Sequence, residues 1–137
     1  MNRSDFKRLT KIRLREARTL LRAGLFEGAY YLCGYAIEYV LKACIAKQTR
    51  RYDFPDKDRV NKSHVHDLVD LVRLGGVKLE LDAETQLDST FRANWNVVKD
   101  WSEKSRYGYP SEQEAHDLYT ATANSKHGVL KWIKRHW

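Results

Sequence analysis

The sequence contains little cysteine and little proline. Two cysteines and two prolines occur among 137 residues. Cys33 and Cys44 are 11 residues apart in one expected helix, which separates them by about 16 Å along its axis. A disulfide needs Cα atoms within about 7 Å, so these two thiols cannot pair within the chain. We expect reduced cysteines and therefore a cytoplasmic protein.

Long apolar runs are absent as well. No stretch approaches the roughly 18 apolar residues that would cross a bilayer. The N-terminus reads Met1-Asn2-Arg3-Ser4-Asp5 and has no apolar signal core behind it. These two features predict neither membrane association nor secretion.

Several chemical signatures are missing too. His64 and His66 straddle the expected start of a helix, and neither cysteine is near them in sequence, so no zinc-site spacing occurs. There is no phosphate-cradling glycine motif, nucleophile elbow or paired-carboxylate pattern. We therefore expect no metal site and no bound cofactor.

Basic charge is abundant and concentrated at the N-terminus. The formal net charge is +7, and residues 1–25 contribute +6 of it, from eight basic and two acidic side chains. Such a face attracts polyanions, RNA above all in the cytoplasm, with an affinity that falls steeply with salt. Solubility explains the same charge equally well, so both interpretations stay open.

Apolar residues follow a helical period in the N-terminal part of the chain. They predict a first helix over residues 4–23 with Ser4 as its N-cap, and a second over residues 26–47 that is apolar nearly all round. The link at Gly24 is very short. We therefore expect these two helices to form an antiparallel hairpin.

Further helices are expected in the remainder, after a polar, charged loop at residues 48–63. A short helix ends at Gly75 and Gly76, and the alternating residues 77–81 form an extended connector, because a lone strand would lack a partner. Asp82 then caps a helix reaching Trp101. Ser111 caps the last helix, in which Glu114 completes a capping box and Gly128 weakens the middle.

The sum of these elements predicts an all-α fold. It is an antiparallel up-and-down bundle of four long helices and one short helix, forming a single domain over residues 1–137. Trp132 and Trp137 lie near the C-terminal end of the last helix. One small monomer does not easily bury both rings, and an exposed pair would suit a homodimer interface.

One acid and one base interrupt the apolar second helix. Glu38 and Lys42 are four residues apart, which places them one turn apart on the same face, with Gly34 a turn earlier. A solvated stripe on an otherwise buried helix is one interpretation, and it is favoured because such pairs are common on helix surfaces. The other is a polar groove.

Four blocks follow one another with a familiar order and spacing. They are LLRAGLFEGA at 20–29, YAIEYVLKA at 35–43, SHVHDL at 63–68 and SRYGYP at 105–110. Together they resemble the HEPN family, the higher eukaryote and prokaryote nucleotide-binding domain. The fourth block is similar to an Arg-Tyr-Pro segment before the last helix of one HEPN branch, here with two residues inserted before the proline. The resemblance implies a helical bundle that forms a homodimer.

Many HEPN proteins are metal-independent RNases, whose motif is Arg, four to six residues, then His. Histidine there moves the 2′-hydroxyl proton while arginine stabilises charge on the phosphate, which leaves cyclic phosphate ends. In this chain Arg59 alone begins such a spacing, with His64 after four residues and His66 after six. Arg59 lies in the charged loop rather than in the C-terminal half where the motif belongs. Arg59 and His64 are therefore weak catalytic candidates.

The Arg-Tyr-Pro branch resembles this chain better. Its members often lack an evident RNase motif, are frequently encoded beside a small nucleotidyltransferase, and have been proposed to bind nucleotides or to serve as its partner. The site implied here consists of Glu38, Lys42, His66, Arg106 and Tyr107. Lysine and arginine would bind phosphate, tyrosine would stack on a base, and histidine would carry a proton.

A purely structural interpretation of the same residues is equally concrete. Glu38 would pair with Lys42 or Arg106 to tie helices together, while Asp67 would cap the third helix, as acidic residues at helix starts often do. The predicted function is a nucleotide- or RNA-binding partner module, in association with a nucleotidyltransferase of toxin–antitoxin type. The alternatives are a metal-independent RNase toxin and a non-catalytic assembly module.

Overall fold

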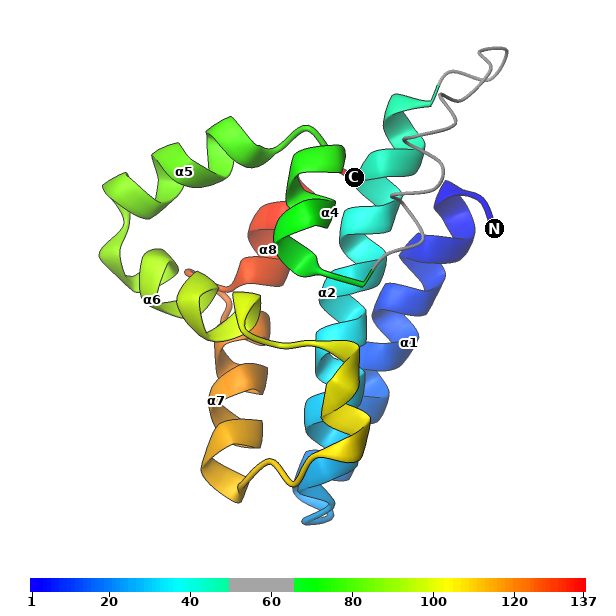
Figure 1. Ribbon diagram of the computed structural model, residues 1–137, viewed down its shortest axis with the longest axis vertical. Helices are drawn as coiled ribbons and strands as arrows, with labels where there is room; N and C mark the ends of the chain where they lie inside the picture. The colour runs from blue at the N-terminus through cyan, green and yellow to red at the C-terminus, as the bar shows by residue number, and fades with distance from the viewer. Residues whose placement is uncertain (50–65) are drawn as a thin grey trace.

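The computed structural model describes residues 1–49 and 66–137, and all regular structure in these ranges is helical (Figure 1). The elements are α1 (Arg3–Arg22), α2 (Phe26–Gln48), α4 (Leu68–Leu74), α5 (Lys78–Leu87), α6 (Ser89–Lys99), the 3-10 helix η1 (Glu103–Tyr107), α7 (Glu112–Ala123) and α8 (Val129–Lys134). The all-α prediction is confirmed. The helices of the second half are shorter and more numerous than the predicted four long and one short.

The first two helices form the predicted antiparallel hairpin. Gly24 makes the turn with a φ of 79°, a left-handed conformation that glycine adopts without a Cβ penalty. The N-cap of α1 is Asn2 rather than Ser4. The Asn2 side chain accepts a hydrogen bond from the Asp5 N–H at 2.9 Å, and the Asp5 carboxylate accepts one from the Asn2 N–H at 2.9 Å.

Helix α2 is the central element of the bundle. Its buried residues point in all directions, and α1, α4, α7, α8 and η1 all pack against it (Figure 1). This arrangement follows from a helix that is apolar nearly all round, since each of its faces needs a covering element. In the described ranges, no helix is both long and apolar enough to span a bilayer.

Residues 77–81 are not the predicted extended connector, because α5 begins at Lys78. Leu81 is the only buried residue of this helix, while Leu79 and Leu87 are 81% and 84% exposed. A helix that buries so little has no continuous apolar stripe, so its pattern resembled alternation. Asp88, rather than Asp82, then caps the next helix by accepting a hydrogen bond from the Phe91 N–H at 3.0 Å.

The predicted last helix is two helices. Ser111 and Glu114 form the predicted capping box at its start, but α7 ends at Ala123 and α8 begins only at Val129. At the break, a side chain on Gly128 would place its Cβ 2.3 Å from the Asn124 carbonyl oxygen. The tight turn therefore requires glycine at this position.

Two further predictions concern the ends of elements. Asp67 caps α4, as expected, by accepting a hydrogen bond from the Asp70 N–H at 3.0 Å. The predicted exposed tryptophan pair is wrong, because Trp132 is 6% exposed and Trp137 is half-buried. The predicted loop at 48–63 falls almost entirely outside the described residues.

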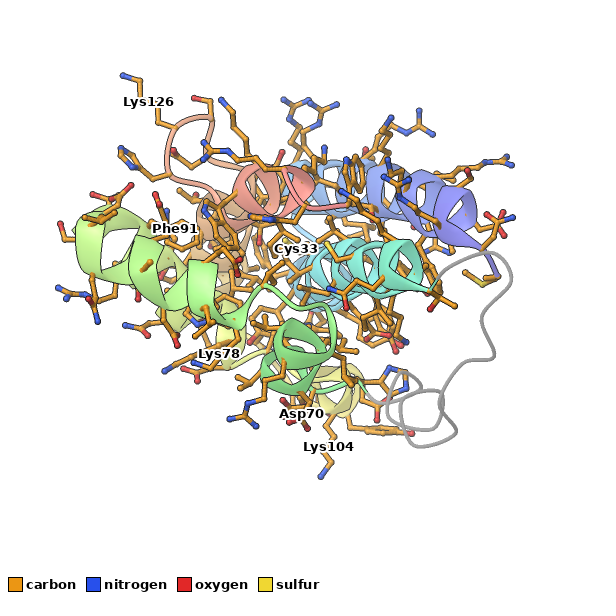
Figure 2. The ribbon with its side chains drawn as sticks, turned by 90° about the horizontal axis from the view of Figure 1, so that it is seen from above. Cys33, Asp70, Lys78, Phe91, Lys104 and Lys126 are labelled. Carbon is orange, nitrogen blue, oxygen red and sulfur yellow. The ribbon has the colours of Figure 1, made fainter. Side chains whose placement is uncertain are left out.

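Both thiols are free and buried, and Figure 2 shows Cys33 among the helices. Burial raises the pKa of Cys33 to about 12 and that of Cys44 to about 11. At pH 8 the thiolate fraction is then at most about 0.1%. We expect iodoacetamide to leave both cysteines unmodified in the folded protein at pH 8 and to modify both in urea. Native-state labelling at the rate of a free cysteine would contradict this burial.

Candidate functional site

Glu38 is a buried carboxylate near the middle of α2. Lys42 Nζ lies 2.8 Å from Glu38 Oε1, and the side chains of the two residues are 13% and 1% exposed, respectively. The solvated-stripe interpretation of this pair is therefore wrong. A buried ion pair contributes little net stability but is costly to break, so its presence inside the bundle calls for a further reason.

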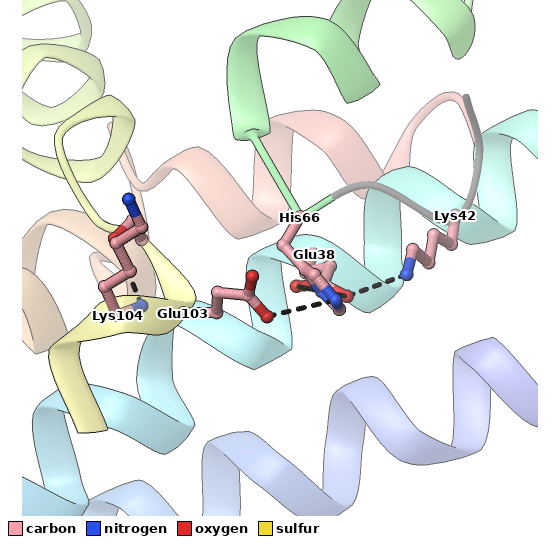
Figure 3. Close-up of polar contacts among 6 residues, drawn as sticks. Glu38, Lys42, His66, Glu103 and Lys104 are labelled. Carbon is pink, nitrogen blue, oxygen red and sulfur yellow. Dashed lines mark hydrogen bonds and ion pairs between the residues drawn. The ribbon is translucent and has the colours of Figure 1, made fainter. Parts of the chain in front are cut away.

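His66 joins this pair from the segment just before α4. Its Nδ1 lies 2.9 and 3.0 Å from the two Glu38 carboxylate oxygens, and its Nε2 lies 3.1 Å from the Glu103 carboxylate of η1 (Figure 3). His66 thus links α2 to η1. The two carboxylates approach opposite ring nitrogens and cannot hold one metal ion together with it. No metal-binding cluster of three side chains occurs among the described residues.

A pocket of about 590 Å³ lies beside these polar groups, with lining residues from α1 and α2. Phe6, Tyr35 and Tyr39 contribute aromatic rings, next to Glu38, Lys42 and His66. The Tyr35 and Tyr39 ring centroids are 5.7 Å apart, and those of Phe6 and Tyr39 are 6.2 Å apart. The volume falls within the roughly 300–1,000 Å³ of small-molecule sites.

The two tyrosine hydroxyls in this pocket are kept protonated. Burial raises the pKa of Tyr35 and of Tyr39 above the ordinary tyrosine value, and the negative charge of Glu38 raises both further. The hydrogen bond between Tyr35 and Tyr31 acts in the same direction on the pKa of Tyr35. The pocket therefore combines an ammonium group, two neutral hydroxyls and three aromatic rings.

Comparison with known proteins now agrees with this architecture. The model of the HEPN domain family matches residues 4–136, nearly the whole chain. This chain belongs to the HEPN domain family. Neither the curated proteins nor the solved structures gave a match.

Three of the site residues predicted for this HEPN domain come together in space, namely Glu38, Lys42 and His66. Arg106 and Tyr107 lie in η1, and Tyr107 is 74% exposed. The weak catalytic candidates Arg59 and His64 lie outside the described residues. The sequence-predicted site is thus assembled in part, from α2 and the segment before α4.

Sequence reasoning about this HEPN domain missed four contributors: Glu103, Phe6, Tyr35 and Tyr39. A signal existed for the tyrosines, because Tyr31, Tyr35 and Tyr39 recur every four residues and share one face of α2. No sequence pattern pointed to Glu103 as a site residue. Only the packing of η1 against α2 brings its carboxylate to His66.

Proposed function

We propose that this HEPN domain is a nucleotide- or RNA-binding module that serves a partner protein, a nucleotidyltransferase in a toxin–antitoxin type of pair. It acts in the cytoplasm and as a homodimer. One observation carries the proposal: the pocket places three aromatic rings beside the Glu38–Lys42–His66 cluster. Rings of this kind stack on nucleobases, and lysine binds phosphate as a point charge.

Lys42 retains capacity for a ligand although it is paired. An ammonium group has three N–H donors, and the hydrogen bond to Glu38 at 2.8 Å uses one of them. Glu38 and His66 hold the lysine in position at the pocket wall. This arrangement supports binding of an anionic group next to a stacked ring.

The RNase alternative relies on Arg59 and His64, which lie outside the described residues, or on a composite site formed across a dimer; His66 also has the RNase spacing from Arg59. In the described structure, both His66 nitrogens already face carboxylates, at 2.9 and 3.1 Å. A general base needs a nitrogen that is available to the substrate proton. His66 is therefore better suited to holding the site together than to serving as a general base. The assembly-module alternative would use the basic α1 to dock an acidic protein.

Nucleotide binding is tested with Lys42→Met and a matched control, Lys78→Met. Lys78 also forms an i,i+4 ion pair, with Asp82 at 2.6 Å, but on the exposed α5. Isothermal titration with nucleoside monophosphates should show at least about 10-fold weaker binding for Lys42→Met, because a charge-assisted hydrogen bond contributes roughly 1.5–3 kcal/mol, and no change for the control. Equal affinity of both variants, each folded by circular dichroism, would exclude Lys42 from the site.

Cleavage is tested by incubating the protein with a structured RNA in the absence of metal. We expect binding without cleavage in the wild type, weakened by Arg106→Ala. Cleavage that leaves cyclic phosphate ends and disappears in His64→Ala or His66→Ala would instead establish the RNase alternative.

A further inference from the structure

The outer face of α1 carries a continuous line of cations. It lies to one side of the face that buries Thr10, Ala17 and Leu21, about a quarter turn around the helix. We call it the α1 stripe, and its members recur every three or four residues: Lys7, Lys11, Arg15, Arg18 and Arg22. At 1.5 Å per residue the stripe is about 22 Å long. Four of its five members are exposed and Lys7 is half-buried.

Within the described residues, no carboxylate forms an ion pair with the α1 stripe. The two acids of α1 are engaged elsewhere, since Asp5 belongs to the N-terminal capping box and Glu16 pairs with Arg13 at 2.8 Å. The cations also crowd one another. Burial and then the positive charges of Arg3, Lys47 and Lys11 lower the pKa of Lys7.

Helix α8 adds a cation to the stripe from a second element. Lys134 lines a shallow groove of about 220 Å³ together with Lys11, Arg15 and Arg18, and with Leu14 and Tyr119. Burial and the charge of Lys11 lower the pKa of Lys134. Figure 2 shows nitrogen-tipped side chains along the outer side of both helices. An anion lying along this surface would relieve the mutual repulsion.

We propose that the α1 stripe, together with Lys134, binds the phosphodiester backbone of single-stranded RNA. The inference rests on the proposed function and deepens it, because it assigns the polymer to a surface that shares no residue with the nucleotide pocket. A stripe about 22 Å long can contact several successive phosphates of one strand. Three of its five members are arginines, which donate two parallel N–H groups to phosphate.

Two observations favour a single strand of RNA over other polyanions. Helix α1 packs along α2 (Figure 1), and its cations form a single row, which can follow the phosphates of one strand. An acidic protein partner is disfavoured because the cores of protein interfaces are apolar and depleted in charge. The stripe itself consists only of charged residues.

The test compares two triple variants in the full chain. The stripe variant carries Lys11→Gln, Arg15→Gln and Arg18→Gln, and the control carries Arg92→Gln, Lys99→Gln and Lys126→Gln, which are exposed cations outside α1. Glutamine keeps a high helix propensity, so both variants should fold. Fluorescence anisotropy with a labelled single-stranded RNA, measured over a series of salt concentrations, gives the affinity and its salt dependence.

We expect the stripe variant to bind the RNA at least about 10-fold more weakly and to lose about two units of the salt slope, since each phosphate contact on a single strand contributes about 0.7. The control triple should bind like the wild type. Wild-type affinity of the stripe variant would overturn the inference. So would competition by polyglutamate or by duplex DNA as strong as that by RNA.

The same proteins separate this inference from the proposed function. Titration with a mononucleotide should give the same affinity for the stripe variant as for the wild type, because the pocket is untouched. Mononucleotide binding with no polymer binding would refute the stripe and leave the proposed function standing. Polymer binding through the stripe, together with an unchanged mononucleotide affinity of Lys42→Met, would support the stripe and refute the proposed nucleotide pocket.

Discussion

A Gly34→Ala variant should lose about 3 kcal/mol of unfolding free energy. A Cβ at Gly34 would lie 2.0 Å from Cε2 of Trp101, whose ring packs directly on the α2 backbone there. Trp101 is 2% exposed and would have to leave its place. Losing a buried tryptophan costs about 3–5 kcal/mol, and the better helix propensity of alanine offsets about 1 kcal/mol.

Urea denaturation followed by circular dichroism measures this loss, and Gly28→Ala on the same helix is its matched control. A Cβ at Gly28 would meet only Leu20 Cδ1, the end of a flexible side chain, at 3.1 Å. We expect that variant to stay within about 1 kcal/mol of the wild type. In a Gly34→Ala/Trp101→Ala double variant, the loss of stability should be much smaller than the sum of the two single losses. Without the Trp101 ring, the clash at the new Cβ of position 34 is removed. Unchanged stability of Gly34→Ala would contradict the placement of Trp101.

A Glu38→Ala variant should be destabilised by about 3 kcal/mol. The substitution leaves Lys42 and His66 without the carboxylate that both contact, at 2.8 and 2.9 Å. Lys42 is largely withdrawn from water, so its charge would remain poorly compensated. Thermal and urea unfolding measure the effect.

Asp82→Ala is the control, because it removes the acid of an i,i+4 pair that is exposed rather than buried. Exposed pairs contribute about 0–1 kcal/mol, so this variant should unfold nearly like the wild type. A Glu38→Leu/Lys42→Met variant should regain much of the stability, since apolar residues often replace a buried ion pair without loss, yet bind nucleotide no better than Lys42→Met. Equal losses in Glu38→Ala and Asp82→Ala would show that burial gives the Glu38 pair no special energetic role.

The errors of the sequence reasoning fall where tertiary contacts outweigh local signals. The first residues of α5, 78–81, were taken for an extended connector because only Leu81 of that helix is buried. The break between α7 and α8 depends on a close approach between Gly128 and the Asn124 carbonyl. The spacing of apolar residues in the sequence does not indicate such a contact. The caps at Asp67 and Ser111 were predictable, because a cap is a contact over three residues.

The candidate site was likewise predictable only in part. The i,i+4 spacing of Glu38 and Lys42 was enough to predict their pairing, and the family resemblance added His66. Burial of the pair was not predictable, since the same spacing is common on exposed faces. It results from the elements that pack around α2.

The sequence by itself determined the all-helical class, the α1–α2 hairpin, the central position of α2 and the basic character of α1. Each of these depends on the periodicity or composition of contiguous residues. Only the tertiary structure decided that Glu103 meets His66, that Trp101 covers Gly34 and that Lys134 joins the α1 stripe. These contacts join residues far apart in the chain, and they form only when the helices that carry them pack together.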